Sequence, residues 1–228
     1  MEASSMTSVL PIEQPPLLAI GAGTALQQCV AAWSSSAPNR DVQVVEISSA
    51  DNFNYDLAVI ESYDRQRCLA FAALSNDAIN FPRLKLMTDL RLLGWRFDRF
   101  ISRHAMIPAG WRPGENGFVA EGAVVGVGST MKHNCWIGAR AIIGPNVKLG
   151  HSVWIGPGAM LGDGVVVGDN TSIGAGAQIC DHVTIGRQCE LLIAQEYRIP
   201  VADRTFYSPL FSEPVRIYGR PGHPTRRG

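Results

Sequence analysis

Two histidines, His133 and His151, are separated by 18 residues. Asp169 and Arg187 follow at the same 18-residue spacing, and Glu115 stands 18 residues before His133. A neutral imidazole can remove a proton from an attacking amine or hydroxyl near neutral pH, because histidine titrates close to that range. This chemistry requires a fold that brings every eighteenth residue to one place. The elements that contain these residues therefore decide whether they form a site.

The segment around the two histidines has a strict six-residue repeat. An aliphatic or Met side chain occupies every sixth position from Val119 to Leu191, in thirteen hexads without a slip. Gly directly follows this residue in nine of the thirteen, and the residue two positions before it is small or is Val, Thr or Cys. A period of six fits neither the period of an α-helix nor a simple alternating strand.

The repeat predicts short strands separated by corners, with glycine where the backbone must bend without a Cβ. Three hexads make one triangular coil of 18 residues, and successive coils stack as parallel strands. We therefore expect a left-handed parallel β-helix over residues 104–194, its hand being that of the known fold with this repeat. His133 and His151 then lie one above the other on the outside of neighbouring coils.

Residues 1–103 have the pattern of a separate α/β domain. A buried-strand run at Leu17–Ile20 leads through a glycine turn into a helix-like stretch at Thr24–Trp33. Further apolar runs alternate with polar or helical stretches, at Val42–Ile47, Leu57–Ile60, Cys68–Leu74 and, for a helix, Arg83–Leu93. This alternation predicts a small Rossmann-like parallel sheet. The boundary is expected near Phe100–Ala105, and residues 195–228 are expected to form a C-terminal cap and tail.

Charge and composition exclude several classes of partner. The 228 residues include 20 basic and 20 acidic side chains, and the zero net charge argues against nucleic-acid or anionic membrane binding. No apolar run is long enough to cross a bilayer, and Met1–Ser5 contains an acid where a secretion signal has Lys or Arg. A cytoplasmic location is therefore expected. Five cysteines without CxxC spacing favour reduced thiols and no metal site.

Several motifs resemble those of one enzyme family. They are His133–Gly138 (HNCWIG), Ile173–Ala177, Leu18–Gly23, Ala73–Asp77 with Arg83, and the start of the coil at Gly94–Ala105. Over nearly the whole chain they are similar to hexapeptide-repeat sugar acyltransferases, which include sialic acid O-acetyltransferases and bacillosamine-type nucleotide-amino-sugar N-acetyltransferases. The resemblance implies a histidine base, acetyl-CoA as co-substrate and a homotrimer with active sites between subunits. It also implies that the N-terminal domain binds the nucleotide sugar.

Carried over by position, the resemblance makes His133 the base, with His151 as the second candidate. Asn134 occupies the position at which the family usually has an acid that orients the imidazole. Ile142 stands nine residues after the base, where relatives often have another histidine near the thioester. Coenzyme A would contact mainly backbone groups and small residues of the coil, at Gly156, Gly174 and Ala175.

The acceptor is expected on the N-terminal domain or a neighbouring subunit, because the hexads contain no inserted loop that could enclose it. Gly21 and Gly23 begin a turn before a helix whose backbone amides could hold a phosphate. The turn lacks the third glycine of a full dinucleotide-binding motif, and a tight strand-to-helix turn explains it equally well. Glu46, at the end of the second strand, could meet a ribose or base.

The leading hypothesis is acetyl transfer from acetyl-CoA to the amino group of a nucleotide-linked amino sugar. O-acetylation of a sugar or sialic acid is the nearest alternative, because the same base serves both acceptors. A metal-dependent hydratase would need three converging histidines, whereas only His133 and His151 share a phase. A non-catalytic assembly or binding subunit is the alternative of another class.

Overall fold

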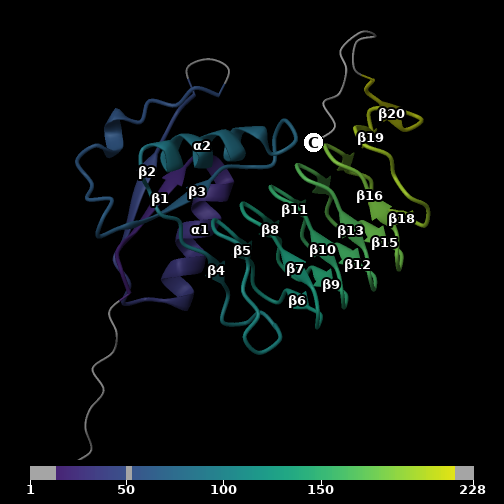
Figure 1. Cartoon of the computed structure of the whole chain (residues 1–228), viewed down its shortest axis with the longest axis horizontal. Helices are drawn as coiled ribbons and strands as arrows, with labels where there is room; N and C mark the ends of the chain where they lie inside the picture. The colour runs from purple at the N-terminus through teal and green to yellow at the C-terminus, as the bar shows by residue number, and fades with distance from the viewer. Residues whose placement is uncertain (1–13, 50–52, 219–228) are drawn as a thin grey trace, which may run out of the picture.

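The computed structural model describes residues 14–49 and 53–218 and has the two expected parts, a small parallel sheet with helices and a long parallel β-helix (Figure 1). The opening residues Met1–Ser5, on which the expected cytoplasmic location was partly based, and the end of the tail lie outside the described residues.

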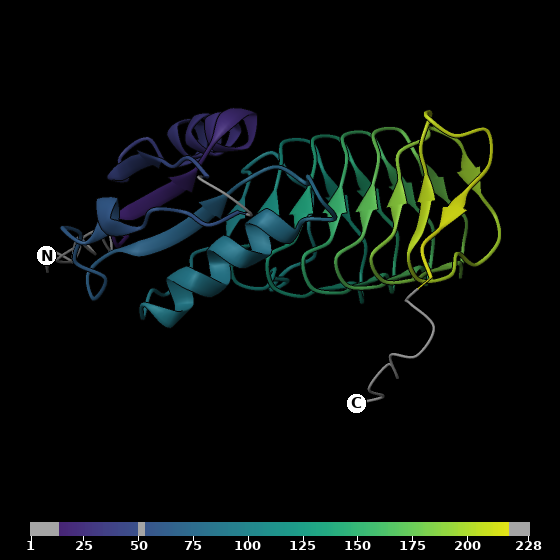
Figure 2. The same cartoon turned by 90° about the horizontal axis from the view of Figure 1, so that it is seen from above.

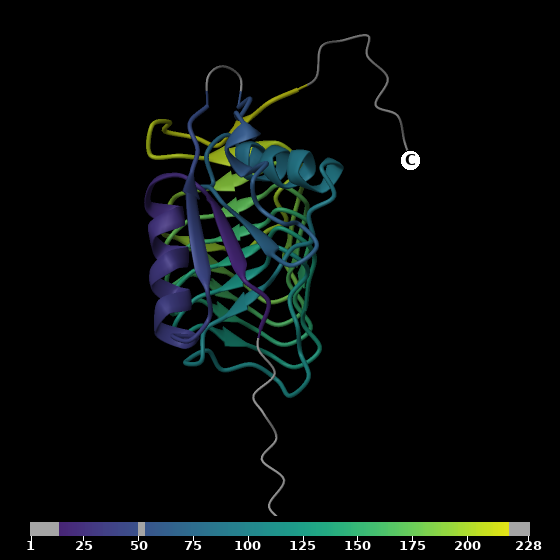
Figure 3. The same ribbon diagram turned by 90° about the vertical axis from the view of Figure 1, so that its left-hand side faces the viewer.

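The N-terminal domain is a three-stranded parallel sheet between two helices. Its strands β1 (Leu17–Gly21), β2 (Val42–Glu46) and β3 (Leu69–Ala73) pair in the order β2-β1-β3. Helix α1 (Gly23–Ser36) packs with Leu17 and Ala19, whereas α2 (Phe81–Leu92) packs with Leu18 and Ile20. Because successive strand residues point to opposite faces, the two helices lie on opposite sides of the sheet (Figure 3).

The run at Leu57–Ile60 does not form a strand. It contains a single 3-10 turn, η1 (Ala58–Ile60), which begins where the Asp56 side chain accepts a hydrogen bond of 3.0 Å from the backbone N–H of Ala58. An aspartate that bonds the backbone two residues ahead favours a turn over an extended conformation. The prediction that this run contributes to the sheet was therefore wrong.

The β-helix has the 18-residue coil predicted from the hexads. Its strands are β4 (Phe100–Ile101), β5 (Phe118–Val119), β6 (Val124–Val125), β7 (Thr130–Met131), β8 (Trp136–Ile137), β9 (Ile142–Ile143), β10 (Lys148–Leu149), β11 (Trp154–Ile155), β12 (Met160–Leu161), β13 (Val166–Val167), β14 (Ser172–Ile173), β15 (Gln178–Ile179), β16 (Thr184–Ile185), β17 (Glu190–Leu191), β18 (Glu196–Tyr197), β19 (Thr205–Tyr207) and β20 (Val215–Arg216). Ile137 pairs with Val119 below and Ile155 above, which confirms the register.

Three sheets form the sides of the coil, with parallel strands throughout except for β20, and are named here after one strand each. The β7 sheet contains β7, β10, β13 and β16, and the β9 sheet contains β6, β9, β12, β15 and β18. The β8 sheet is the longest, with β4, β5, β8, β11, β14, β17, β19 and β20. The apolar hexad residues of all three sheets fill the interior. At Gly156 an added Cβ would lie 2.6 Å from the backbone N of Ala175, so the hexad glycines allow coils to stack closely.

The coil is longer at both ends than residues 104–194. It starts at Phe100, which pairs with Phe118, and it continues to β19 (Figure 2). In the last turn the spacing falls from 18 to 16 residues, because Leu191 pairs with Tyr207. This slip hides the final turn from a search for a strict period. The antiparallel strand β20 then covers the end of the β8 sheet.

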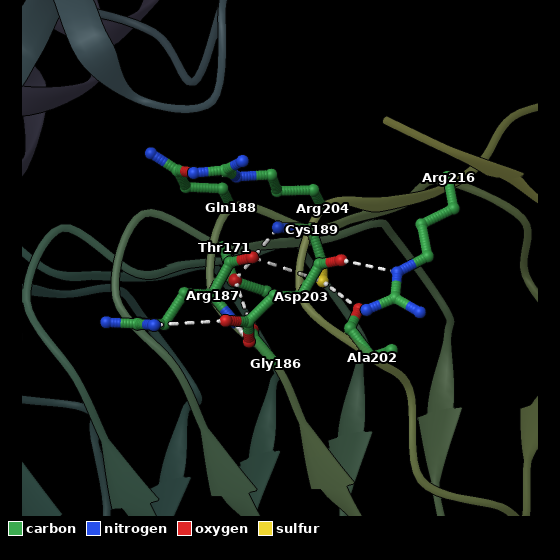
Figure 4. A network of polar contacts seen from close by, with 9 residues as sticks. All are labelled: Thr171, Gly186, Arg187, Gln188, Cys189, Ala202, Asp203, Arg204 and Arg216. Atoms are coloured by element: carbon green, nitrogen blue, oxygen red, sulfur yellow. Dashed lines mark hydrogen bonds and ion pairs between the residues drawn. The ribbon is translucent and has the colours of Figure 1, made fainter. Parts of the chain in front are cut away.

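Polar side chains hold the last turn in place (Figure 4). Asp203 accepts hydrogen bonds from the backbone N–H and guanidinium of Arg187, at 2.8 and 3.1 Å. Arg204 donates to Gln188, and Arg216 donates to the backbone oxygen of Asp203. The bonds of Asp203 and Arg204 thus attach the last turn to the coil below it, and the bond from Arg216 attaches β20 to the last turn.

An aromatic stack joins the two parts of the molecule. Phe118 lies 4.8 Å from the Phe100 ring and 3.9 Å from the Trp136 ring, and Trp33 of α1 packs against Phe100 at 4.7 Å. Trp136 stacks in turn on Trp154 at 4.7 Å. These side chains point outward from the β8 sheet, and the N-terminal domain covers the first of them. The domain is therefore fixed on this sheet of the coil.

Candidate active site

His133 and His151 lie one above the other at the corner between the β7 and β8 sheets. Their rings are nearly parallel, with centroids 5.5 Å apart and an interplanar angle of 16°. The column predicted from the spacing is therefore present. Glu115 lies below His133, and Asp169 follows above, where its carboxylate accepts a 2.7 Å hydrogen bond from the backbone N–H of His151.

Helix α2 runs past this corner and forms a cleft with it. The volume of the cleft is about 230 Å³. Its lining from α2 is Leu84, Met87, Thr88, Arg91 and Leu92, and from the coil it is His133, Asn134, His151 and Ser152. Both imidazoles therefore face a partly apolar space between the two parts of the chain, where a small reactant could reach them.

The His133 ring is held from the coil below. The backbone N–H of Glu115 donates a hydrogen bond of 3.0 Å to Nδ1 of His133, and the Glu115 carboxylate Oε2 lies 3.9 Å from the same nitrogen. Arg91 of α2 forms an ion pair with that carboxylate. Because Nδ1 is an acceptor here, the proton of neutral His133 is on Nε2. The Glu115–Arg91 pair was missed by the sequence interpretation, which placed Glu115 in the column without a partner.

His151 has a different environment. Burial lowers the pKa of its imidazole from the usual value, while the Asp169 carboxylate acts in the opposite direction and raises it. Lys132 and His133 lower this pKa further. The net shift favours the neutral ring, which is the form that can accept a proton.

Asn134 occupies a buried structural position. Its φ of +60° is left-handed, a conformation that Asn adopts more readily than most residues, and the residue is only 1% exposed. Its amide donates to Ser152 Oγ at 2.9 Å, and its oxygen accepts from Asn116 at 2.8 Å. Asn116 in turn bonds both backbone groups of Ala72 in β3. The side chain of Asn134 thus connects coils and domain and does not bond the His133 ring.

Arg83 strengthens the same junction. It is buried, and its guanidinium donates to the backbone oxygen of Asn134 at 3.1 Å and to Asn80 at 3.2 Å. It also lies over the Trp154 ring, 5.0 Å from the centroid. Burial lowers its pKa to about 10, so the side chain is charged at neutral pH. The position of α2 beside the histidines therefore depends on a charged group bonded to the residue after His133.

The residues expected to contact coenzyme A lie at another corner. Gly156, Gly174 and Ala175 are at the corner between the β8 and β9 sheets, and Ile142 begins β9 with 39% exposure. The two glycines are explained by packing, since a Cβ at Gly174 would lie 2.8 Å from the backbone oxygen of Leu191. The histidine corner and this corner belong to different edges of one triangular coil, so a single chain does not bring them together.

The residues expected to contact the acceptor lie together at the carboxyl edge of the N-terminal sheet. Gly21, the last residue of β1, is flanked by Glu46 of β2 and Ala73 of β3. A Cβ at Gly21 would lie 1.8 Å from the oxygen of Ala73, so close strand packing alone requires this glycine. Gly23 has a φ of +59° and open space around it, at a helix start that has no side-chain cap. Ligands of open parallel sheets bind at this edge.

The part of the chain that the structure describes has neither a candidate metal-binding cluster nor a helix suited to span a membrane. Residues 14–49 and 53–218 contain no group of three or more His, Cys, Asp or Glu side chains that could hold a metal ion. Neither helix in these ranges has the length and apolar character needed to span a bilayer.

Comparisons with known proteins agree with this fold. The family model for the bacterial transferase hexapeptide (six repeats) matches residues 146–181. The acetyltransferase domain of PglB from Neisseria gonorrhoeae FA1090 is 18% identical with a TM-score of 0.76, over 89% of this chain and 100% of that one. It has also been solved in complex with acetyl coenzyme A. The sequence matches no curated protein.

Two further structures are similar in fold over most of this chain. PerB from Caulobacter crescentus, in complex with CoA and GDP-perosamine, is 23% identical with a TM-score of 0.70, over 84% of this chain and 92% of that one. WeeI from Acinetobacter baumannii AYE is 14% identical with a TM-score of 0.54, over 88% and 99%. The chain is thus similar in fold, from the N-terminal sheet through the coil, to these proteins.

The side-chain hydrogen bonds of Asn134 with Asn116 and Ser152 predict a stability difference between two corner asparagines. Asn170 has a left-handed φ of +56°, like Asn134 two coils below, but its side chain has no hydrogen bond to the described residues. We expect Asn134→Ala to lower the free energy of unfolding by about 1–3 kcal/mol more than Asn170→Ala, because buried partners lose their bonds. Urea denaturation followed by circular dichroism measures both. Equal losses of unfolding free energy would show that the side-chain hydrogen bonds of Asn134 contribute nothing beyond the backbone conformation.

The environment of His151 predicts how stability depends on pH. Its folded pKa is below the unfolded value of about 6.5, so the unfolded chain binds the proton more readily and stability falls as the pH drops through that range. The free energy of unfolding of His151→Gln should therefore decrease less than that of the wild type between about pH 7.5 and pH 5. His182→Gln, at an exposed position, is the control. The same decrease in wild type and His151→Gln would refute the interpretation.

Proposed function

We propose that this protein transfers an acetyl group from acetyl-CoA to the amino group of a nucleotide-linked amino sugar. The observation that carries the proposal is the pair of stacked imidazoles in a cleft, on a fold similar to that of an acetyltransferase domain solved with acetyl coenzyme A. The similar fold of PerB, solved with CoA and GDP-perosamine, supports a nucleotide-sugar acceptor.

His133 is the proposed general base, and His151 is the second candidate. As the amine attacks the thioester carbonyl, the imidazole takes one of its protons, the nitrogen–carbon bond forms and the carbon–sulfur bond breaks. The thiolate leaves as coenzyme A and is then protonated. Asn134 keeps the histidine corner in position through its buried bonds and is not a proton-transfer group in this proposal.

Acetyl-CoA is proposed to bind along the corner with Gly156, Gly174 and Ala175, near Ile142. Because this corner and the His133 corner are different edges of the coil, we infer that the site is complete only if a neighbouring subunit supplies one of the two. A homotrimer meets this requirement. The β9 sheet offers an apolar surface for such contacts, in the exposed or half-exposed column of Met106, Val124, Ile142 and Met160.

The acceptor is proposed to bind at the carboxyl edge of the N-terminal sheet. The backbone N–H groups of Gly23 and the residues after it can donate to a phosphate, since the first turn of a helix has unpaired donors and a positive dipole end. Glu46 lies beside Gly21 at the same edge and could accept hydrogen bonds from a ribose.

A thiol-release assay with acetyl-CoA and a panel of nucleotide amino sugars tests the proposal. We expect activity from a trimer, as judged by sedimentation, and a loss of kcat/KM of about 10²–10⁴-fold in His133→Ala because the base is removed. His182→Ala, at another corner, is the matched control and should retain wild-type activity.

Three outcomes would contradict parts of the proposal. Full activity in both His133→Ala and His151→Ala would eliminate the base assignment. Activity with hydroxyl acceptors alone would indicate sugar O-acetylation. If calorimetry detects no binding of acetyl-CoA, the chain is a non-catalytic assembly or binding subunit.

A further inference from the structure

Glu115 has a relation to His133 that no other acid shares. Among the described residues it is the only carboxylate with an oxygen within 4.0 Å of a histidine ring nitrogen. It belongs to the coil below, 18 residues before His133, and its backbone N–H already bonds the ring. Asn134 has no negative charge and its amide is committed to Asn116 and Ser152. Glu115 is therefore the one acid placed to act on this imidazole.

The proton position on His133 decides whether the ring can act as a base. With Nδ1 accepting the N–H of Glu115, the ring proton is on Nε2, and Nε2 cannot take another. If Nδ1 instead carries the proton and donates a hydrogen bond to the Glu115 carboxylate, Nε2 has a free lone pair. The two neutral tautomers differ only in which nitrogen holds the proton. Water takes the proton from Nε2 and supplies one to Nδ1, so the net charge of the ring does not change.

Arg91 competes with His133 for the same carboxylate oxygen. Both Arg91 and His133 approach Oε2 of Glu115, Arg91 from helix α2 and His133 from the coil. The Arg91 side chain is 52% exposed, lines the cleft and lies over the Phe97 ring, 5.5 Å from its centroid. Exposed ion pairs contribute little net free energy, so an anion that enters the cleft can take Arg91 away.

We propose that the Arg91–Glu115 ion pair is a gate on the base. While the pair is closed, His133 is the Nε2–H tautomer and is inactive. When an anionic group pairs with Arg91, Nε2 gives its proton to water and Nδ1 takes one from water. The ring gives up the hydrogen bond from the Glu115 backbone N–H, Nδ1–H donates a hydrogen bond to the released Glu115 carboxylate, and Nε2 becomes the proton acceptor. Glu115 and Arg91 are positioning residues in this scheme, which rests on the proposed function only for the identity of the reaction that follows.

Nitrogen NMR of the full chain with ¹⁵N-labelled histidine reads the tautomer directly, and His133→Gln assigns the signals. At about pH 8, where histidine is neutral, the wild type should have the proton on Nε2. Arg91→Ala should shift His133 mainly to the Nδ1–H form, because Glu115 is released. The double variant Arg91→Ala/Glu115→Gln should return it to Nε2–H, since the neutral amide no longer attracts the proton.

Arg96→Ala is the matched control, because Arg96 bonds the backbone of Gln66 instead. Inorganic pyrophosphate is the anion probe and should move the wild-type signals in the direction of Arg91→Ala, with no effect on the double variant. An unchanged His133 spectrum in Arg91→Ala would overturn the gate, and no response to pyrophosphate would overturn its opening by anions. These spectra require no turnover, so they succeed or fail independently of the acyltransferase proposal.

Discussion

The rest of the structure depends on the backbone register between stacked coils. Each coil donates its strand hydrogen bonds to the coil 18 residues away, as at Trp136 and Trp154, and this repeats along the β8 sheet. Glycines such as Gly156 let the corners approach to distances that a Cβ would prevent. A register of one fixed length places every eighteenth residue in a column, which is why His133 and His151 meet.

The junction with the N-terminal domain converts this column into a cleft. The coil alone would expose the histidines on a convex corner, and helix α2 supplies the opposite wall. Buried polar bonds fix that wall, because Arg83 bonds the backbone of Asn134 and Asn116 bonds the edge of β3 at Ala72. Buried polar groups are costly when unpaired, so these bonds specify one arrangement of the two parts. The same helix brings Arg91 to Glu115.

Features that depend on a repeated spacing could be predicted from the sequence. The hexads predicted the coil, its register and the histidine column, since each depends on a spacing that recurs. It could not reveal the Arg91–Glu115 pair or the Arg83 bond to Asn134, which join residues 24 and 51 positions apart across the domain junction. The two-residue slip before β19 broke the period and hid the last turn. A local aspartate turn at Asp56 overrode the apolar run that followed it.

We propose that acetyl transfer occurs at the His133 corner with the donor on a neighbouring subunit. A crystal structure of the assembled protein with coenzyme A tests it most directly. We expect the thiol of coenzyme A beside His133 of one subunit, and the rest of the molecule along the Gly156–Ala175 corner of the next. Coenzyme A bound within a single chain, or with its thiol away from both His133 and His151, would contradict it.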